Sequence, residues 1–253
     1  MISKLRSRQK TSLLWALAAT AAFASPTRAE EASAKDAFLE ANILSIFYHE
    51  LGHAVIDLMQ VPIFGQEEDA ADVMAVLMID SLFDEETAQS LAYDSAFGYI
   101  NDPEGTEEVE YWDLHGPDEQ RYYNHVCLFF GANPEERDDL AEELGLPEYR
   151  AETCPEEYDQ AANSWGAIFD EMAELSKGTE ISFVAGSGAD ADLIASVLAA
   201  EIEALNNDFQ LPENVRVFVD TCGEANAFYD PGDVSITFCE EFIPHLRDLF
   251  DRF

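Results

Sequence analysis

The sequence predicts an α+β fold that is mostly helical, with a small antiparallel sheet near its C-terminal end. Apolar residues recur three to four positions apart through most of residues 35–176, which is the period of an amphipathic helix. After Lys177 and Gly178 the pattern changes, and Val215-Arg216-Val217-Phe218-Val219 alternates strongly enough to predict a strand. We therefore expect a helical part over residues 35–176 and a sheet-containing part over residues 177–253.

The first expected helix covers residues 35–60. Its apolar residues run from Phe38 to Met59 at helical spacing, and no proline occurs before Pro62. After a turn at residues 62–65, acidic residues in the first turn of a second helix favour its start at Glu67, because carboxylates stabilise the positive end of the helix dipole. We expect this second helix to reach Phe83.

The remaining elements follow from the same two periodicities. The turn residues Asp230, Pro231, Gly232 and Asp233 separate the last two strands, so these strands are expected to form a hairpin. We expect helices at residues 85–98, 117–130, 134–144, 155–175 and 190–206, strands at 181–184, 215–219, 225–229 and 234–238, and a closing helix from about residue 240.

The N-terminus has the composition of a secretory signal peptide. Basic residues between Lys4 and Lys10 precede an apolar run at residues 13–24, and Thr27 and Ala29 provide small side chains for cleavage before Glu30. We expect residues 1–29 to be a signal peptide and residues 30–253 a single exported domain, periplasmic or extracellular, with no membrane contact after cleavage. A retained membrane anchor is the alternative, although the apolar run is short for a bilayer.

Four cysteines in an exported chain predict two disulfides. We favour the pairs Cys127 with Cys154 and Cys222 with Cys239, because each closes a short local loop. A zinc site built from all four thiolates is the weaker alternative, since the chain has no C-x-x-C pair.

The charge balance excludes several classes of partner. The chain has 13 Lys and Arg against 52 Asp and Glu, a formal net charge of −39. No basic stripe is left for a nucleic acid backbone, and an anionic membrane surface is disfavoured. The acidity is typical of a solvated surface, and the alternative interpretation is a field that repels acidic substrates. The sequence predicts no particular oligomeric state.

The motif with the most specific chemistry is His49-Glu50-Leu51-Gly52-His53, an H-E-x-x-H motif inside the first expected helix. Two histidines four residues apart project from one helix face and can bind one zinc ion. Glu50 lies about 100° round the helix, where its carboxylate can reach a zinc-bound water without being a ligand. The motif predicts a catalytic zinc site with Glu50 as general base.

A third ligand is expected from the second helix. Asp57 lies roughly 12 Å along the helix axis from His49, too far to share its ion. Glu68 is the preferred ligand and Glu67 its alternative, while Asp72, one turn beyond Glu68, is placed to accept a hydrogen bond from a ligating imidazole. The other interpretation of these acids is that they only stabilise the helix dipole.

H-E-x-x-H followed by E-x-x-x-D on the next helix resembles the gluzincin metallopeptidases, of which thermolysin is the best-known type. A second match is Asn226-Ala227-Phe228-Tyr229, which is similar to the edge strand on which thermolysin-like enzymes bind their peptide substrate. Together with EEDAAD at 67–72, DEQRYYN at 118–124 and CGEANAFY at 222–229, these motifs resemble an uncharacterised family of exported bacterial proteins described as metallopeptidases.

The resemblance implies a zincin-like fold that binds one Zn²⁺ per chain, with Asn226, Ala227 and Phe228 in contact with substrate. In thermolysin-like enzymes that strand precedes the metal helix, so its position here implies a permuted zincin in which the sheet follows the metal helix. The alternative is an ordinary hairpin on a separate C-terminal domain. The chain also departs from thermolysin, because no motif marks the histidine that stabilises the oxyanion.

Four residues are candidates for that missing role. His115 and Tyr229 are preferred, and His125 and Tyr123 are the other two; the alternative for each of the four is an ordinary surface or core residue. The sequence as a whole predicts an exported zinc-dependent peptidase in which Glu50 activates a zinc-bound water to attack a peptide bond. The competing hypothesis is a non-catalytic binding protein that keeps a structural metal on a zincin scaffold, but such a protein would have no need of Glu50.

Overall fold

The structure is a computed structural model that describes residues 28–100, 108–176, 178–184, 186 and 188–253. Residues 1–27 of the expected signal peptide lie outside the described residues. The elements, in chain order, are α1 (Arg28–Met59), α2 (Glu67–Leu82), α3 (Glu85–Phe97), α4 (Asp118–Ala132), α5 (Asp138–Glu143), α6 (Glu148–Ala151), α7 (Cys154–Glu174), β1 (Ile181–Phe183), α8 (Ala189–Asp208), β2 (Val215–Asp220), β3 (Ala227–Asp230), β4 (Ser235–Cys239) and α9 (Phe242–Phe250).

The α+β class and most of the helices agree with the sequence prediction. α1 begins earlier than expected and ends at Met59, where Gln60 adopts a left-handed conformation with φ of 54° ahead of Pro62. The helix expected at residues 134–144 is shorter, because residues 134–137 form turns before α5. The one-turn helix α6 follows Pro147 and was not predicted.

The expectation of an antiparallel sheet is wrong for most of its pairs. The strand order is β1-β2-β4-β3, with β1–β2 and β2–β4 parallel and only β3–β4 antiparallel. β1 and β2 are joined through α8, a helical crossover that makes them parallel. After β2, residues 221–226 lead to β3 at the edge of the sheet. The β3–β4 hairpin then places β4 between β2 and β3.

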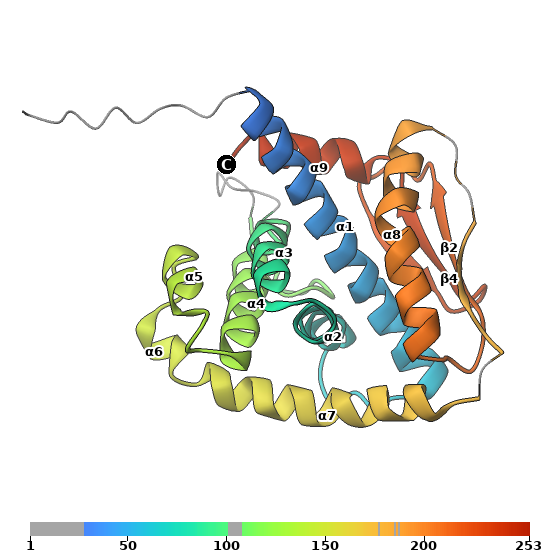
Figure 1. Ribbon diagram of the computed structural model, residues 1–253, viewed down its shortest axis with the longest axis horizontal. Coiled ribbons are helices and arrows are strands. Elements are labelled where there is room, and N and C mark those ends of the chain that lie inside the picture. The colour runs from blue at the N-terminus through green and yellow to red at the C-terminus, as the bar shows by residue number, and fades with distance from the viewer. Residues whose placement is uncertain (1–27, 101–107, 177, 185, 187) are drawn as a thin grey trace, which may run out of the picture.

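α1 is the central helix of the molecule (Figure 1). It packs against α2 and α3 on one side and against α8, α9, β3 and β4 on the other. Its buried residues include Phe47 and Tyr48, which have no exposed surface and belong to one continuous core with the sheet residues Val217 and Phe238. The helix that carries the H-E-x-x-H motif is therefore held from both halves of the chain.

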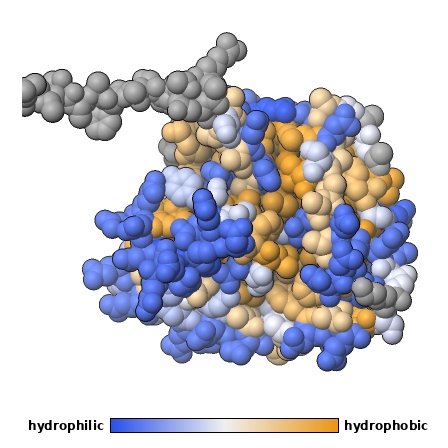
Figure 2. Space-filling view, in the orientation of Figure 1, coloured by the Kyte–Doolittle hydropathy of each residue, from blue (hydrophilic) through white to orange (hydrophobic). Residues whose placement is uncertain are grey.

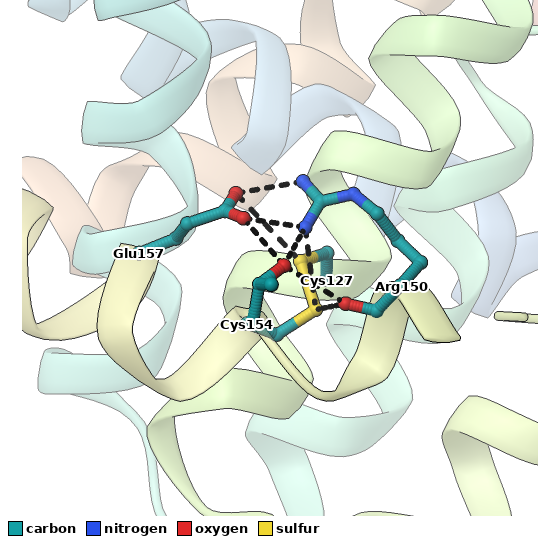
Figure 3. The surroundings of a disulfide bond; sticks show 5 residues. Cys127, Arg150, Cys154 and Glu157 are labelled. Carbon is teal, nitrogen blue, oxygen red and sulfur yellow. Dashed lines mark hydrogen bonds and ion pairs between the residues drawn. A yellow bond between two sulfur atoms is a disulfide. The ribbon is translucent and has the colours of Figure 1, made fainter. Parts of the chain in front are cut away.

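Both expected disulfides are present. Cys127–Cys154 joins α4 to α7, and Cys222–Cys239 joins the 221–226 loop to β4. Figure 3 shows that Arg150 and Glu157 lie over the first bridge, where the guanidinium donates hydrogen bonds of 2.6 and 2.7 Å to the carboxylate. No free cysteine is found among the described residues, so a zinc site of four thiolates is not formed.

The acidic charge lies on the outside of this core. On the face in Figure 2, hydrophilic residues dominate the periphery and hydrophobic residues gather towards the middle, where α1 runs in Figure 1. In the part of the chain that the structure describes, no helix has the length and apolar character needed to cross a membrane.

His125 is a buried core residue of α4 and not a cavity residue, in contrast to its place among the oxyanion candidates. Its side chain is packed beside the ring of Tyr99, at a centroid distance of 5.4 Å, and its Nε2–H donates to the carbonyl of Ala92 at 3.1 Å. Its Nδ1 is buried without a hydrogen-bond partner in the described structure. Burial lowers the pKa of His125 to about 4.

This histidine should make the protein sensitive to mild acid. Since its folded-state pKa lies below the value of about 6.5 in an unfolded chain, its contribution to stability is present above about pH 6.5 and is lost as the pH falls towards 4. The loss should be on the order of 3 kcal/mol. Chemical denaturation of the wild type and of His125→Gln across this range should show the steeper fall for the wild type.

Asp94 has the opposite effect on stability in this pH range, because burial raises its pKa to about 6. The wild type and His125→Gln both contain Asp94, so its effect cancels when their stabilities are compared. Parallel stability profiles for the wild type and His125→Gln would contradict the assignment.

Candidate metal centre

The two histidines of the H-E-x-x-H motif lie at the floor of a large cavity. It has a volume of about 1540 Å³, and its lining includes the middle of α1, the start of α2, the end of α3 with residues 98–100, residues 108–121, and residues 225–231 around β3. The sequence elements singled out above, far apart in the chain, thus meet around one cavity. This arrangement places the edge strand β3 next to the metal helix.

Three of the expected metal ligands form a nearly equilateral triangle. His49 Nε2 and His53 Nε2 are 3.3 Å apart, and each lies 3.2 Å from Glu68 Oε2. In a tetrahedral zinc site with bonds of about 2.0–2.1 Å, ligand atoms are about 3.3 Å apart. The triangle therefore has the dimensions of one face of such a site.

The other nitrogen of each imidazole is already bound to a carboxylate. His49 Nδ1 donates to Asp72 and His53 Nδ1 donates to Glu67, both at 2.8 Å. With those protons on Nδ1, the Nε2 lone pairs of both rings point at each other and at the Glu68 oxygen. Converging acceptors of this kind need a cation between them, so the donor set fits a metal ion. Glu67 binds the far side of His53 and not the centre of the triangle.

The electrostatics of these groups favour positive charge at the same place. Although burial opposes its charged form, hydrogen bonds to Asp72 and Glu68 raise the pKa of His49 to about 9. The pKa of Glu68 is far below its usual range in spite of burial, because the imidazoles of His115, His49 and His53 stabilise its carboxylate when they are protonated. The site thus stabilises a cation, whether a proton or a metal ion.

Arg121 is the supporting residue that the sequence analysis missed. Its Nε and Nη2 bind the two oxygens of Asp72 at 2.8 Å each, and its guanidinium stacks on the ring of Tyr99 at 4.8 Å. Asp72 is thereby fixed while it accepts from His49. Arg121 lies in the DEQRYYN motif at 118–124, one of the motifs that resemble the metallopeptidase family. Nothing in the sequence indicates that this motif contacts the helix of His49 and His53.

Gly52 in the motif allows the second helix to approach. A Cβ atom at this position would lie 3.0 Å from the Cα of Ala71 on α2, closer than side-chain atoms normally come. Because the glycine has no side chain, α1 and α2 pack closely enough for Glu68 and Asp72 to reach His49. A larger residue here would push the third ligand away.

Glu50 is buried beside the triangle, with 4% of its surface exposed. The backbone N–H of Tyr229 in β3 lies near its carboxylate and favours the charged form. Burial raises the pKa of Glu50, against the opposing effect of His49 and His53. Glu50 lines the cavity without binding Glu68, so its carboxylate is separate from the ligand set.

Tyr229 ties β3 to α1, and within the described part of the chain one edge of β3 has no strand partner. The Tyr229 hydroxyl donates to Asp57 at 2.9 Å, so it does not lie free beside the metal triangle. The Asn226 carbonyl accepts a hydrogen bond from the Cys239 N–H of β4. Because the backbone N–H and C=O groups of successive residues point to opposite edges of a strand, the N–H and C=O of Ala227 face the edge away from β4. There the Ala227 N–H binds the Asn226 side chain.

Among the oxyanion candidates, His115 is the one that the fold brings to the metal triangle. Its Nε2 is 3.0 Å from Glu68 Oε2, and its ring lies 6.3 Å from that of His49. Ligand atoms of His49, Glu68 and His115 all lie within 4.8 Å of one another. Its Nδ1 is 3.4 Å from Asp113, and its side chain is half-exposed. Tyr123 packs on Tyr122 and does not line the cavity.

Comparison with known proteins gives one match. Residues 13–169 and 191–252 match the model of a protein family described as "Putative metallopeptidase". The match spans most of the chain and includes every residue of the triangle. Searches of curated proteins and of solved structures found no match.

Proposed function

The chain belongs to this family of putative metallopeptidases, and we propose that it is an exported zinc-dependent peptidase of the gluzincin type. The observation that carries the proposal is the triangle of His49, His53 and Glu68, with a buried Glu50 next to it. Two histidines and one glutamate are a ligand set of catalytic zinc sites, which keep a fourth position open. A zinc ion held by these residues supplies a Lewis acid that polarises a peptide carbonyl and acidifies water.

Glu50 acts as the general base. Its carboxylate takes a proton from the attacking water and delivers it to the departing amine, so the carboxylate returns to its starting state. The Tyr229 amide lies near this carboxylate and favours its charged form. A site that used its metal only for structure would not need an acid buried at this position, which favours catalysis over the scaffold hypothesis.

The substrate binds as an added strand along the free edge of β3. The Ala227 C=O faces this edge and can accept from a substrate N–H, and the Ala227 N–H becomes available when the Asn226 side chain moves away. Phe228 is 42% exposed and offers an apolar contact next to that edge. Because the Tyr229 amide lies near Glu50, the same strand contacts both the peptide and the base.

His115 is the residue proposed to stabilise the oxyanion. Its Nε2 lies 3.0 Å from Glu68 Oε2, beside the metal triangle, and Asp113 near its Nδ1 can orient the ring. Protonated His115 can donate to negative charge that develops on the substrate. Tyr229 is less suited to this role, because its hydroxyl is bound to Asp57.

Two disulfides support export, because such bridges form and persist in oxidising compartments. They agree with the signal-peptide composition of residues 1–29. We therefore propose a periplasmic or extracellular location, with peptides or proteins as substrates.

The first test separates the base from the ligands. Glu50→Gln should retain one zinc per chain and lose peptide hydrolysis by roughly two orders of magnitude or more, because only the proton acceptor is removed. His49→Ala should lose the zinc itself. Metal analysis and a peptide-library cleavage assay with and without chelator provide the measurements. Loss of zinc from Glu50→Gln, or undiminished cleavage by it, would show that Glu50 has another role.

The second test concerns Arg121. Arg121→Gln should lower zinc affinity roughly 10- to 100-fold, the usual effect of losing a group that orients a metal ligand, since Asp72 is then no longer held against His49. Competition with a chromogenic chelator measures this affinity directly.

Arg137 provides the matched control. It is also buried, binds Glu85 through Nε and Nη2 at 2.8 and 2.9 Å, and stacks on Phe129 at 3.7 Å, but it lies outside the cavity. Arg137→Gln should lower stability and leave zinc affinity unchanged. Equal losses of affinity in the two variants would mean that Arg121 acts only through general stability.

A further inference from the structure

Residues 108–117, called here the mouth segment, expose an unusual set of apolar side chains. Tyr111, Trp112 and Leu114 are 81%, 76% and 74% exposed, and Val109 is 37% exposed. No other stretch of this length among the described residues exposes so many large apolar groups. Exposed apolar patches of this kind commonly mark binding surfaces, because burial against a partner removes them from water.

The mouth segment lies at the rim of the metal-centre cavity. Val109, Leu114 and His115 line the cavity, and His115 contacts Glu68. Ala227 and Phe228 of β3 line the same cavity, so its walls include both an apolar segment and an unpaired strand edge. A peptide extended along β3 therefore passes within the space that the mouth segment bounds.

The charges around this apolar surface are almost all negative. The mouth segment alternates its apolar residues with Glu108, Glu110 and Asp113, and α4 adds Glu119 to the same wall. Of the described residues that line the cavity, Arg121 is the only Lys or Arg, and both of its bonds to Asp72 hold it in place. A cavity of this composition repels acidic peptides and attracts basic ones.

We propose that the mouth segment and β3 together dock a cationic, amphipathic peptide, and that such peptides are the substrate class of the enzyme. This proposal rests on the proposed function, in which a peptide substrate binds along the free edge of β3. Lysine or arginine side chains of the peptide lie between the carboxylates and the faces of Tyr111 and Trp112, which attract cations through their π-electrons. Its apolar side chains pack on Leu114 and Phe228.

Charge favours this occupant over two others. A second copy of the chain has the same net charge of −39 and would bring like charges together at the patch. An anionic lipid surface is repelled for the same reason. A peptide that is both basic and apolar matches the two properties of the surface at once.

Binding is tested on the catalytically inactive Glu50→Gln protein loaded with zinc, so that the peptide is not consumed. The probes are fluorescently labelled short peptides of alternating lysine and leucine, and of alternating glutamate and leucine, followed by fluorescence anisotropy. The lysine peptide should bind at least roughly tenfold more tightly, and its affinity should fall as salt is added, because surface charges are screened.

Two further sets of changes in the same background locate the contact. Glu108→Gln with Glu110→Gln, and Tyr111→Ser with Trp112→Ser, should each weaken lysine-peptide binding by roughly threefold to tenfold. The matched controls are Glu171→Gln with Glu174→Gln on α7 and the exposed Tyr149→Ser on α6, all outside the cavity lining. These controls should leave the affinity unchanged.

Equal affinity for the two peptides, or equal weakening by mouth-segment and control variants, would overturn the proposal. Cleavage by the wild type then distinguishes it from the proposed function. If neutral and cationic peptides are cleaved equally well, the peptidase assignment holds and the docking proposal fails. If the lysine peptide binds at the mouth segment but no peptide is cleaved, docking stands and the peptidase assignment fails.

Discussion

The site depends on the convergence of three acceptor atoms that have no proton to share. The Nδ1–H groups of His49 and His53 donate hydrogen bonds to Asp72 and Glu67, so the Nε2 lone pairs of both rings are directed at the Glu68 oxygen. Such an arrangement is unfavourable without a cation, so the supporting structure has to hold it in place. Gly52 permits the close packing of α1 and α2 that this requires, and the buried Arg121 holds Asp72.

The edge strand β3 connects the metal centre to the surface where a substrate could bind. Its Tyr229 hydroxyl binds Asp57 of α1 and its Tyr229 amide lies near Glu50, while Ala227 presents its backbone to the free edge. The Cys222–Cys239 bridge fixes the loop that leads into this strand. Because one strand serves both purposes, a shift of β3 would disturb the orientation of Glu50 and the position of a bound peptide together.

Local patterns were sufficient to predict most of the helices, both disulfides and the residues of the triangle. α1 and α2 have strong periodicity, and the spacing of two histidines on one helix is a short-range property. The sheet was predicted incorrectly, because strand order depends on where residues 221–226 carry the chain, and no local signal encodes that path. Arg121 was missed, and whether His125 belongs to the core or to the site was left open, for the same reason, since burial and contact between distant helices decide both.

The central claim is that the triangle binds zinc through two imidazoles and one carboxylate. X-ray absorption spectroscopy at the zinc edge, on wild-type protein equilibrated with limiting zinc and washed free of excess metal, tests it most directly. The account predicts one zinc per chain, with histidine nitrogen and carboxylate oxygen in its first coordination sphere and no sulfur. A protein that retains no zinc, or a spectrum dominated by sulfur ligands, would contradict it.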